Sequence, residues 1–412
     1  MQFHNWHNLH SPNASSLADG NSSGAQGLVI NDSLDAPSPL GTTTPEYIMN
    51  DSGELSPAYE ATSHSTALSA TTAPAAGAPP APTRVGSANG LQFDLVWDPS
   101  IANAPRGFVQ AIVDAAKTYS ELFSNKEVIA IDVGYGEIAG SPMAPNALGE
   151  SESFGYLTDY PTVTTALTGD GFGFSATNEP TTGQFFITSA DAKTLGLVAP
   201  ASGLDGFMGF SDLSGTGFSW NISGAKGPNI GTGSNQFDLQ AVAEHEMSEV
   251  MGRLGLEGTA TINGQPVYTP LDLFNYQSRG VLELSANGGY FSVNDGRTNL
   301  GNYNNAAVNG GDIADWASST SPTQSGTFGL SKGSQDAYDA FTFPGQNGQI
   351  SLSDIVEDAA LGYKLAPIGN LALLANYVAA GFPSAAGPNG DTAAVHDGQA
   401  TNQQSVLSLP HA

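Results

Sequence analysis

The sequence predicts an α+β fold with a twisted mixed sheet, one central helix and a loop-rich C-terminal half. Three observations predict it. A strand, a helix and a second strand follow one another between Leu91 and residue 138. The segment 236–254 then repeats apolar residues with helical spacing. Beyond this helix, glycine and asparagine interrupt short apolar runs, a pattern typical of turns and short strands.

The first of these units begins with LQFDLVWD at Leu91, where apolar and polar residues alternate as in a strand. Residues 104–123 carry apolar side chains at helical spacing, and the β-branched run VIAIDVGYGEI follows as a strand. Residues 140–230 are rich in glycine. The remaining predicted elements are short strands at FFITSA and DGFMGFSD and a late helix at SLSDIVEDAALGY.

The segment QFDLQAVAEHEMSEVMGRL, residues 236–254, is the clearest helix. We expect Ser234 or Asn235 to cap its N-terminus and Gly255 to end it. One face should be buried through an apolar stripe. The stripe consists of Leu239, Val242, Ala243, Val250, Met251 and Leu254.

Two tails are expected to flank the folded domain, which the sequence places at residues 91–366. Residues 1–90 are rich in Ser, Thr, Ala and Pro and lack apolar periodicity, so we expect disorder. Residues 367–412 contain one apolar helix, LALLANYVAAGF, and then a flexible polar tail. Three histidines near the N-terminus could chelate a metal, but the entropy lost on ordering a tail favours a chance grouping. They are His4, His7 and His10.

The composition is acidic and free of cysteine, with 39 Asp and Glu, 11 Lys and Arg and a net charge of −28. This charge repels phosphate, so no nucleic-acid partner is expected. Membrane insertion is not expected either, because no apolar run approaches the ~18 residues of a spanning helix. The lack of cysteine excludes disulfides, zinc–thiolate sites and thiol nucleophiles. These features fit an extracellular monomer.

Export is expected to depend on the C-terminal tail. The N-terminal residues MQFHNWHNLHSPNASS lack the basic and apolar regions of a signal peptide. After Lys364 the chain has no Lys or Arg and becomes rich in small residues, which resembles the uncleaved signals that engage a bacterial type I secretion apparatus. An ordinary frayed terminus is the alternative interpretation.

The helix 236–254 carries the residues with the clearest chemical potential. His245 and Glu249 are four positions apart and project from one face, with Glu246 beside them. In H-E-x-x-H enzymes the first and fifth residues hold zinc and the second activates water. Here the fifth residue is a glutamate, which also binds Zn²⁺ and is compatible with Mn²⁺. The other six histidines lie in the expected tails, so any further ligands must be oxygen donors.

The same residues also have a purely structural interpretation. Glu249 and Arg253 have the i, i+4 spacing of an ion pair on a helix surface, and His245 could be a partly buried histidine with satisfied polar atoms. Three aspartates in Gly/Asn-rich turns either bind structural Ca²⁺ or simply stabilise their turns. They are Asp295, Asp312 and Asp315.

Other catalytic patterns find little support. A Ser-His-Asp triad would have to use His245, and no G-x-S-x-G elbow lies between a predicted strand and helix. No phosphate-binding G-x-x-x-x-G-K-[ST] motif occurs. The 39 acids show no spacing that singles out a glycosidase pair.

Several stretches between residues 91 and 365 occur in a distinctive order. They are FDLVWDPSIANAPRGFVQAIVDAA, IDVGYGEIAG, AEHEMSEVMGR, TPLDLFNYQSRG, YFSVNDG, GGDIADWA and ISLSDIVEDAALGY. Together they resemble a family of secreted bacterial metzincin-like zinc metalloproteinases, whose central helix looks like H-E-[ILM]-x-[HE]-V-[ML]-G. The resemblance implies a metzincin-like domain, with His245 and Glu249 as metal ligands and Glu246 as general base.

The chain departs from the metzincin pattern in three ways. Glu249 replaces the usual second histidine, although such variants occur in the resembling sequences. Gly255 stands where the third ligand usually lies. No methionine follows Met251, so the methionine turn beneath the metal is absent.

The third ligand must therefore come from another residue. Asp272 is the first choice, because an apolar strand at PLDLF would fix it rigidly, and Glu257 is the second. Tyr276 is a candidate donor to the oxyanion. The resulting expectation is an extracellular endopeptidase that cleaves protein or peptide substrates. Two alternatives remain: a catalytically impaired surface protein of the same shape that acts in adhesion or recognition, and a glycan-binding or glycan-cleaving protein.

Overall fold

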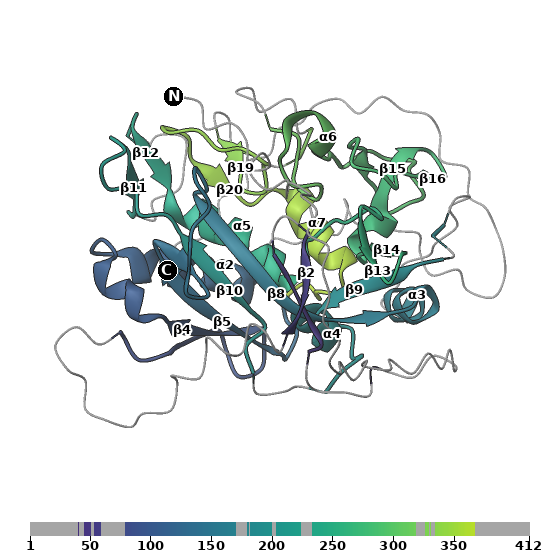
Figure 1. Ribbon diagram of the computed structural model, residues 1–412, viewed down its shortest axis with the longest axis horizontal. Coiled ribbons are helices and arrows are strands. Elements are labelled where there is room, and N and C mark those ends of the chain that lie inside the picture. Colours follow the sequence, from purple (N-terminus) through teal and green to yellow (C-terminus); the bar gives the residue numbers. More distant parts are fainter. Residues whose placement is uncertain are drawn as a thin grey trace, which may run out of the picture.

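The computed structural model describes residues 40, 45–50, 53–58, 79–169, 179–180, 182–199, 203–223, 233–318, 326–328, 330 and 334–366. The fold is a mixed α+β fold, as the sequence predicts. In Figure 1 a large mixed sheet fills the lower part of the view, and the later elements, from β15 (Asn275–Ser278) to α7 (Leu352–Ala360), lie above it. The helix α5 (Leu239–Met251) runs between the two.

The large sheet has the strand order β13-β14-β9-β8-β10-β5-β4-β3, and β1 pairs with both β2 and β8. The pairs β4/β5, β5/β10 and β9/β14 are parallel, whereas the other neighbours are antiparallel. Its strands are β1 (Tyr47–Asn50), β2 (Leu55–Pro57), β3 (Thr83–Val85), β4 (Gln92–Trp97), β5 (Val128–Tyr135), β8 (Gly149–Thr158), β9 (Gln184–Thr188), β10 (Gly206–Phe210), β13 (Ala260–Ile262) and β14 (Gln265–Tyr268).

The remaining elements are helices, 3₁₀ turns and small sheets. The other α-helices are α2 (Phe108–Leu122), α3 (Tyr160–Gly169), α4 (Ser189–Thr194) and α6 (Ala306–Asn309), and the 3₁₀ turns are η1 (Pro99–Asn103) and η2 (Leu271–Phe274). The small sheets are β6 (Glu137–Ile138) with β7 (Ser141–Pro142), β11 (Ser219–Asn221) with β12 (Gln236–Asp238), β15 with β16 (Val281–Leu282), β17 (Tyr290–Phe291) and β18 (Gly301–Asn302), and β19 (Gln335–Asp336) with β20 (Gly348–Gln349).

The predicted strand, helix and strand are confirmed as β4, α2 and β5, and the late helix is confirmed as α7. Both predicted short strands exist as β9 and β10. The first of them ends earlier than the run FFITSA does, because Thr188 caps α4 by accepting a 3.1 Å hydrogen bond from the backbone N–H of Asp191.

Two regions contain more structure than the sequence predicts. β1, β2 and β3 lie within residues 1–90, where disorder is expected, and β1 pairs with β8 from Tyr47–Gly155 to Asn50–Glu152. The glycine-rich region 140–230 contains the ten-residue strand β8 and the helices α3 and α4. The N-terminal histidines and residues 367–412, with their predicted helix and secretion signal, lie outside the described residues.

The helix α5 is shorter than the predicted 236–254 and is buried on almost every side. Its N-cap is Asp238 rather than Ser234 or Asn235, because residues 236–238 form β12 and pair with β11. It ends at Gly252, whose φ of 123° is easily adopted only by glycine, rather than at Gly255. α2, β8 and β10 pack against it, and β20 also contacts it.

One large apolar cluster extends from Val85 to Tyr363, so the sheet and the C-terminal half share a core. This shared core fixes α5 relative to both. Among the described residues, no helix combines the length and hydropathy that a bilayer span requires.

Candidate metal centre

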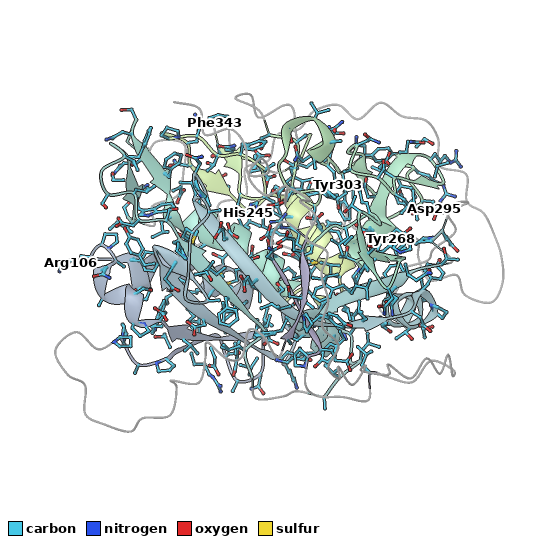
Figure 2. The ribbon with its side chains drawn as sticks, in the orientation of Figure 1. Arg106, His245, Tyr268, Asp295, Tyr303 and Phe343 are labelled. Atoms are coloured by element: carbon cyan, nitrogen blue, oxygen red, sulfur yellow. The ribbon has the colours of Figure 1, made fainter. Side chains whose placement is uncertain are left out.

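His245 is the only histidine in the described part of the chain, and it lies near the middle of the molecule (Figure 2). It is the one residue of α5 that is not fully buried, with 14% of its side chain exposed. Its Nδ1 lies 2.9 Å from the carbonyl oxygen of Ala337. Because a carbonyl only accepts, Nδ1 carries the hydrogen, and the lone pair of Nε2 remains for another partner.

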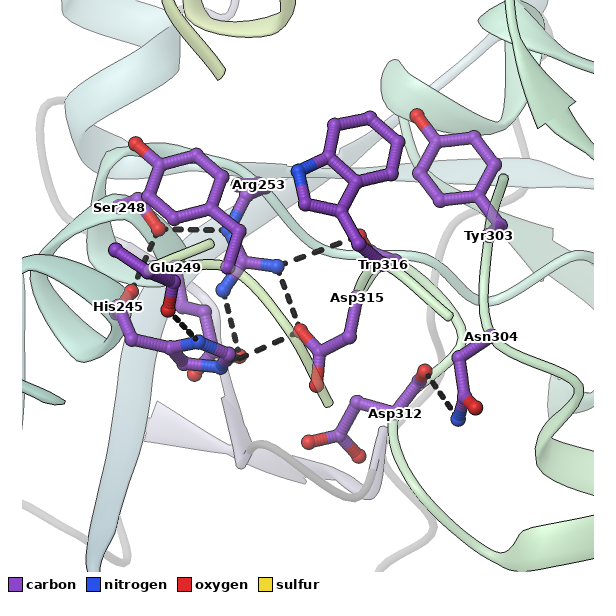
Figure 3. Close-up of polar contacts among 12 residues, drawn as sticks. His245, Ser248, Glu249, Arg253, Tyr303, Asn304, Asp312, Asp315 and Trp316 are labelled. Carbon is purple, nitrogen blue, oxygen red and sulfur yellow. Dashed lines mark hydrogen bonds and ion pairs between the residues drawn. The ribbon is translucent and has the colours of Figure 1, made fainter. Parts of the chain in front are cut away.

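Two carboxylates approach this Nε2 atom (Figure 3). It lies 3.4 Å from Oε1 of Glu249, one turn along α5, and 3.3 Å from Oδ1 of Asp315. The ligand atoms of the three residues all lie within 4.8 Å of one another. A tetrahedral zinc ion with bonds of about 2.0–2.2 Å separates its ligands by about 3.3–3.6 Å. The two distances from Nε2 match this geometry, so the three residues fit a metal ion.

The structure brings Asp315 to this position, not the residues predicted as third ligand. Asp272 lies in the 3₁₀ turn η2, not in the predicted strand. Its carboxylate accepts hydrogen bonds from the backbone N–H groups of Leu256, Glu257 and Thr269 and thereby connects two loops. Neither Asp272 nor Glu257 lines the pocket around His245. Tyr276, the predicted oxyanion donor, does not line this pocket either.

The sequence did not predict Asp315 as the third ligand, because the residues considered for this role were acids that follow the helix closely in the sequence. The available signal was its place in GGDIADWA, one of the stretches that carry the family resemblance. Of the three turn aspartates, Asp312 lines the same pocket as Asp315, whereas Asp295 lies at the periphery of the molecule (Figure 2).

Arg253 lies behind the two carboxylates and is completely buried. Its Nη1 is 2.6 Å from Oδ1 of Asp315, and its Nη2 is 3.3 Å from Oε1 of Glu249. The predicted Glu249–Arg253 pair therefore exists, but in the interior rather than on a helix surface. The Nε–H of Arg253 donates to Ser248 at 2.6 Å, and its guanidinium lies 4.4 Å from the ring centre of Tyr338. These contacts fix the guanidinium and, through it, both carboxylates.

Ser151 of β8 determines which oxygen of Glu249 faces the histidine. Its Oγ–H donates a 2.7 Å hydrogen bond to Oε2 of Glu249, and both residues are buried. The other oxygen, Oε1, is the one near His245. The strand and the helix thus orient Glu249 for binding through a single oxygen.

The charges of these residues shift one another's pKa values. Burial lowers the pKa of His245, but the charge of Asp315 and hydrogen bonds to both carboxylates raise it well above its usual value overall. Burial raises the pKa of Asp315, whereas the charges of His245 and Arg253 bring it below its usual value. Burial and the charges of Asp315 and Glu249 raise the pKa of Asp312 well above its usual value. A metal at this site would therefore replace a proton on His245.

The three residues open into a pocket of about 60 Å³, which has room for a few water molecules. Glu246 lines this pocket beside His245. Gly149, the first residue of β8, also lines the pocket next to Glu246, and a Cβ atom there would come within 2.3 Å of Oε1 of Glu246. Glycine at this position therefore allows the strand to approach the glutamate closely.

No protein-family model matches the chain, and no characterised protein or solved structure matches it significantly. The residues of the pocket are thus the main guide to function.

Proposed function

We propose that the protein is a metal-dependent endopeptidase of the metzincin type, with His245, Glu249 and Asp315 as metal ligands. One observation carries this proposal: the ligand atoms of the three residues lie within 4.8 Å of one another, in a pocket that Glu246 also lines. One imidazole and two carboxylates suit Zn²⁺, and the two hard oxygen donors make Mn²⁺ a competitor.

The remaining residues have distinct roles in this mechanism. A bound zinc ion would supply Lewis acidity, which polarises a peptide carbonyl and acidifies water. The carboxylate of Glu246 would take a proton from the attacking water and return it to the leaving amine. Arg253 does not line the pocket, so its role is to hold the ligand carboxylates rather than to touch the substrate.

A strand edge without a partner strand in the described part of the chain lies beside the pocket and favours a peptide substrate. β10 pairs with β8 from Gly149 to Ser153, while on the opposite side β1 pairs only from Glu152 and β9 only from Gly155. Among the described strands, none pairs with Gly149–Ser151 on that side. An extended peptide can add to such an edge through main-chain hydrogen bonds, and Gly149 would place it at the pocket.

The decisive test is Glu246→Gln. The zinc-loaded variant should keep about one metal ion per chain, measured by mass spectrometry, and lose at least ~10²-fold of its peptide hydrolysis. Glu152→Gln is the matched control, because Glu152 lies on β8 but does not line the pocket. Equal hydrolysis by the wild-type protein and Glu246→Gln, or a wild-type protein that binds no metal, would contradict the proposal.

A second candidate function is recognition without catalysis, by a protein of the same shape that binds no metal. The ion pairs of Arg253 with Glu249 and Asp315 favour it, because they already offset the charge of both carboxylates. His245→Ala distinguishes the two candidates. Loss of a stoichiometric metal in this variant supports the metalloenzyme, whereas a metal-free wild type supports the recognition protein.

A further inference from the structure

The loop after α5 encloses a second, smaller cavity of about 10 Å³. This volume has room for about one water-sized particle. The residues that line this cavity include Glu257, Asp272 and Asn275 together with Ile313 and Ala314. Two of the acids that the sequence suggests as metal ligands thus lie together, but away from the pocket of His245.

Two residues that line this cavity each have a buried side-chain oxygen without a hydrogen-bond partner. These atoms are Oε2 of Glu257 and Oδ1 of Asn275, and the two residues are only 2% and 3% exposed. The Nδ2 group of Asn275 donates to the other carboxylate oxygen of Glu257, so the two side chains are fixed against each other. Buried acceptors without a donor are unfavourable, and a bound cation is one way to satisfy them.

The neighbouring acids create a negative potential at Glu257, which a bound cation would offset. Burial, together with the charges of Asp272 and Glu283, raises the pKa of Glu257 to about 10. None of the ion pairs among the described residues involves these three acids. The carboxylate of Asp272 is engaged by backbone N–H groups, which offset its charge only in part.

The backbone at Glu257 is held in an unusual conformation. Its φ of 46° lies in the left-handed region, which residues other than glycine rarely adopt. Its backbone N–H donates to Asp272 at 2.8 Å, which helps to hold this conformation. Such an outlier at a buried, unpaired carboxylate is typical of a binding position.

We propose that this cavity binds a calcium ion through Oε2 of Glu257 and Oδ1 of Asn275. A carboxylate and an amide oxygen are hard donors that suit Ca²⁺, whereas no nitrogen or sulfur ligand favours zinc here. Calcium takes 6–8 oxygen ligands, so carbonyl groups and water would complete its coordination.

The position of this site defines its role. Glu257 lies in the loop just after Arg253, and Ala314 immediately precedes Asp315. An ion between these segments would fix the end of α5 relative to the loop that presents Asp315. The role is structural, and it does not depend on whether the first site is catalytic.

The test uses the full chain, stripped of metal ions and then titrated with calcium chloride. We expect about one Ca²⁺ per chain by calorimetry and a rise in Tm of several degrees, because an ion that binds only the folded state stabilises it. The same response should persist in His245→Ala, which removes the first site. This result would show that calcium binding does not depend on the proposed metal site at His245.

Three variants make the test specific. Glu257→Gln should lose the calcium response, and Asn275→Asp should strengthen calcium binding at least several-fold by adding a second carboxylate. Asp295→Asn, at a turn aspartate outside this cavity, should respond like wild type. Wild type without a calcium response, which would indicate a buried water, would overturn the proposal. So would an unchanged response in both Glu257→Gln and Asn275→Asp, or a response lost only in Asp295→Asn.

Discussion

Ser151 orients Glu249, one of the proposed metal ligands, through a single hydroxyl. Its Oγ–H donates to Oε2 of Glu249 at 2.7 Å, so removing it frees the carboxylate to rotate. Partners of this kind contribute about 10–100-fold to metal affinity. We therefore predict that Ser151→Ala weakens zinc binding about 10-fold in competition with a chromophoric chelator. The control is Ser153→Ala on the same strand, whose hydroxyl contacts only the backbone oxygen of Glu249, at 3.3 Å. Equal zinc affinity in the two variants would contradict this role.

The substitution Glu249→His tests whether Glu249 binds a metal or only pairs with the buried Arg253. Imidazole should raise the preference for zinc over manganese. The same change removes one of the two carboxylates that pair with the buried Arg253, so the Tm of the metal-free protein should fall by several degrees. Metal competition and thermal unfolding measure the two effects. If Glu249 only pairs with Arg253, the Tm will fall and the metal preference will not change.

At the residue scale, the sequence predicts those ligands whose relation is local. His245 and Glu249 project together because four positions make about one helical turn. Asp315 lies beside them only because the C-terminal half packs onto α5. Residue spacing in the sequence does not predict this contact. Asp272 lies nearer in sequence, but it binds backbone N–H groups instead.

At the scale of elements, β8 was the least predictable feature. Its first half, Gly149–Ser153, contains two glutamates and two serines and lacks apolar alternation. These polar residues are nevertheless largely buried, because the strand packs against α5 and donates to Glu249. β4, α2 and β5 were predictable because their side chains follow the periods of a strand and a helix.

The close approach of β8 to α5 leads to a prediction at Gly149. A Cβ atom there would lie 2.3 Å from Oε1 of Glu246, so Gly149→Ala must displace this carboxylate. We expect unchanged metal content and at least ~10-fold slower peptide hydrolysis, because a general base acts only at hydrogen-bond distance. Gly169→Ala is the control, since a Cβ atom there meets nothing within 4 Å. Unchanged hydrolysis in Gly149→Ala would show that Glu246 is not the base or that it tolerates displacement.

For the whole molecule, the excess of buried acids predicts the pH dependence of stability. Burial, reinforced by the charges of nearby acids, raises the pKa values of Asp132, Glu152 and Asp336 to about 7. The folded state therefore binds more protons than the unfolded chain between about pH 4 and about pH 7. This contribution is complete below the unfolded pKa values and is lost as the pH rises through about 7.

The metal-free protein should consequently have a Tm several degrees lower at about pH 8 than at about pH 5. Asp132→Asn should make this decrease smaller, because it removes one of the responsible groups. Thermal unfolding in the presence of a chelator measures both effects. A Tm that rises over this range would show that these acids are already ionised in the folded protein.

The proposed ligands come from two segments of the chain more than 60 residues apart, and this arrangement determines when the site can form. His245 and Glu249 belong to α5, whereas Asp315 lies between α6 and β19. While the chain is being synthesised, His245 and Glu249 are made before Asp315. Until Asp315 has joined them, the chain offers a metal ion only two donors. The complete ligand set forms only when the C-terminal half has packed onto the helix. The proposed peptidase would therefore acquire its complete metal site, and with it any activity, only after its own folding is complete.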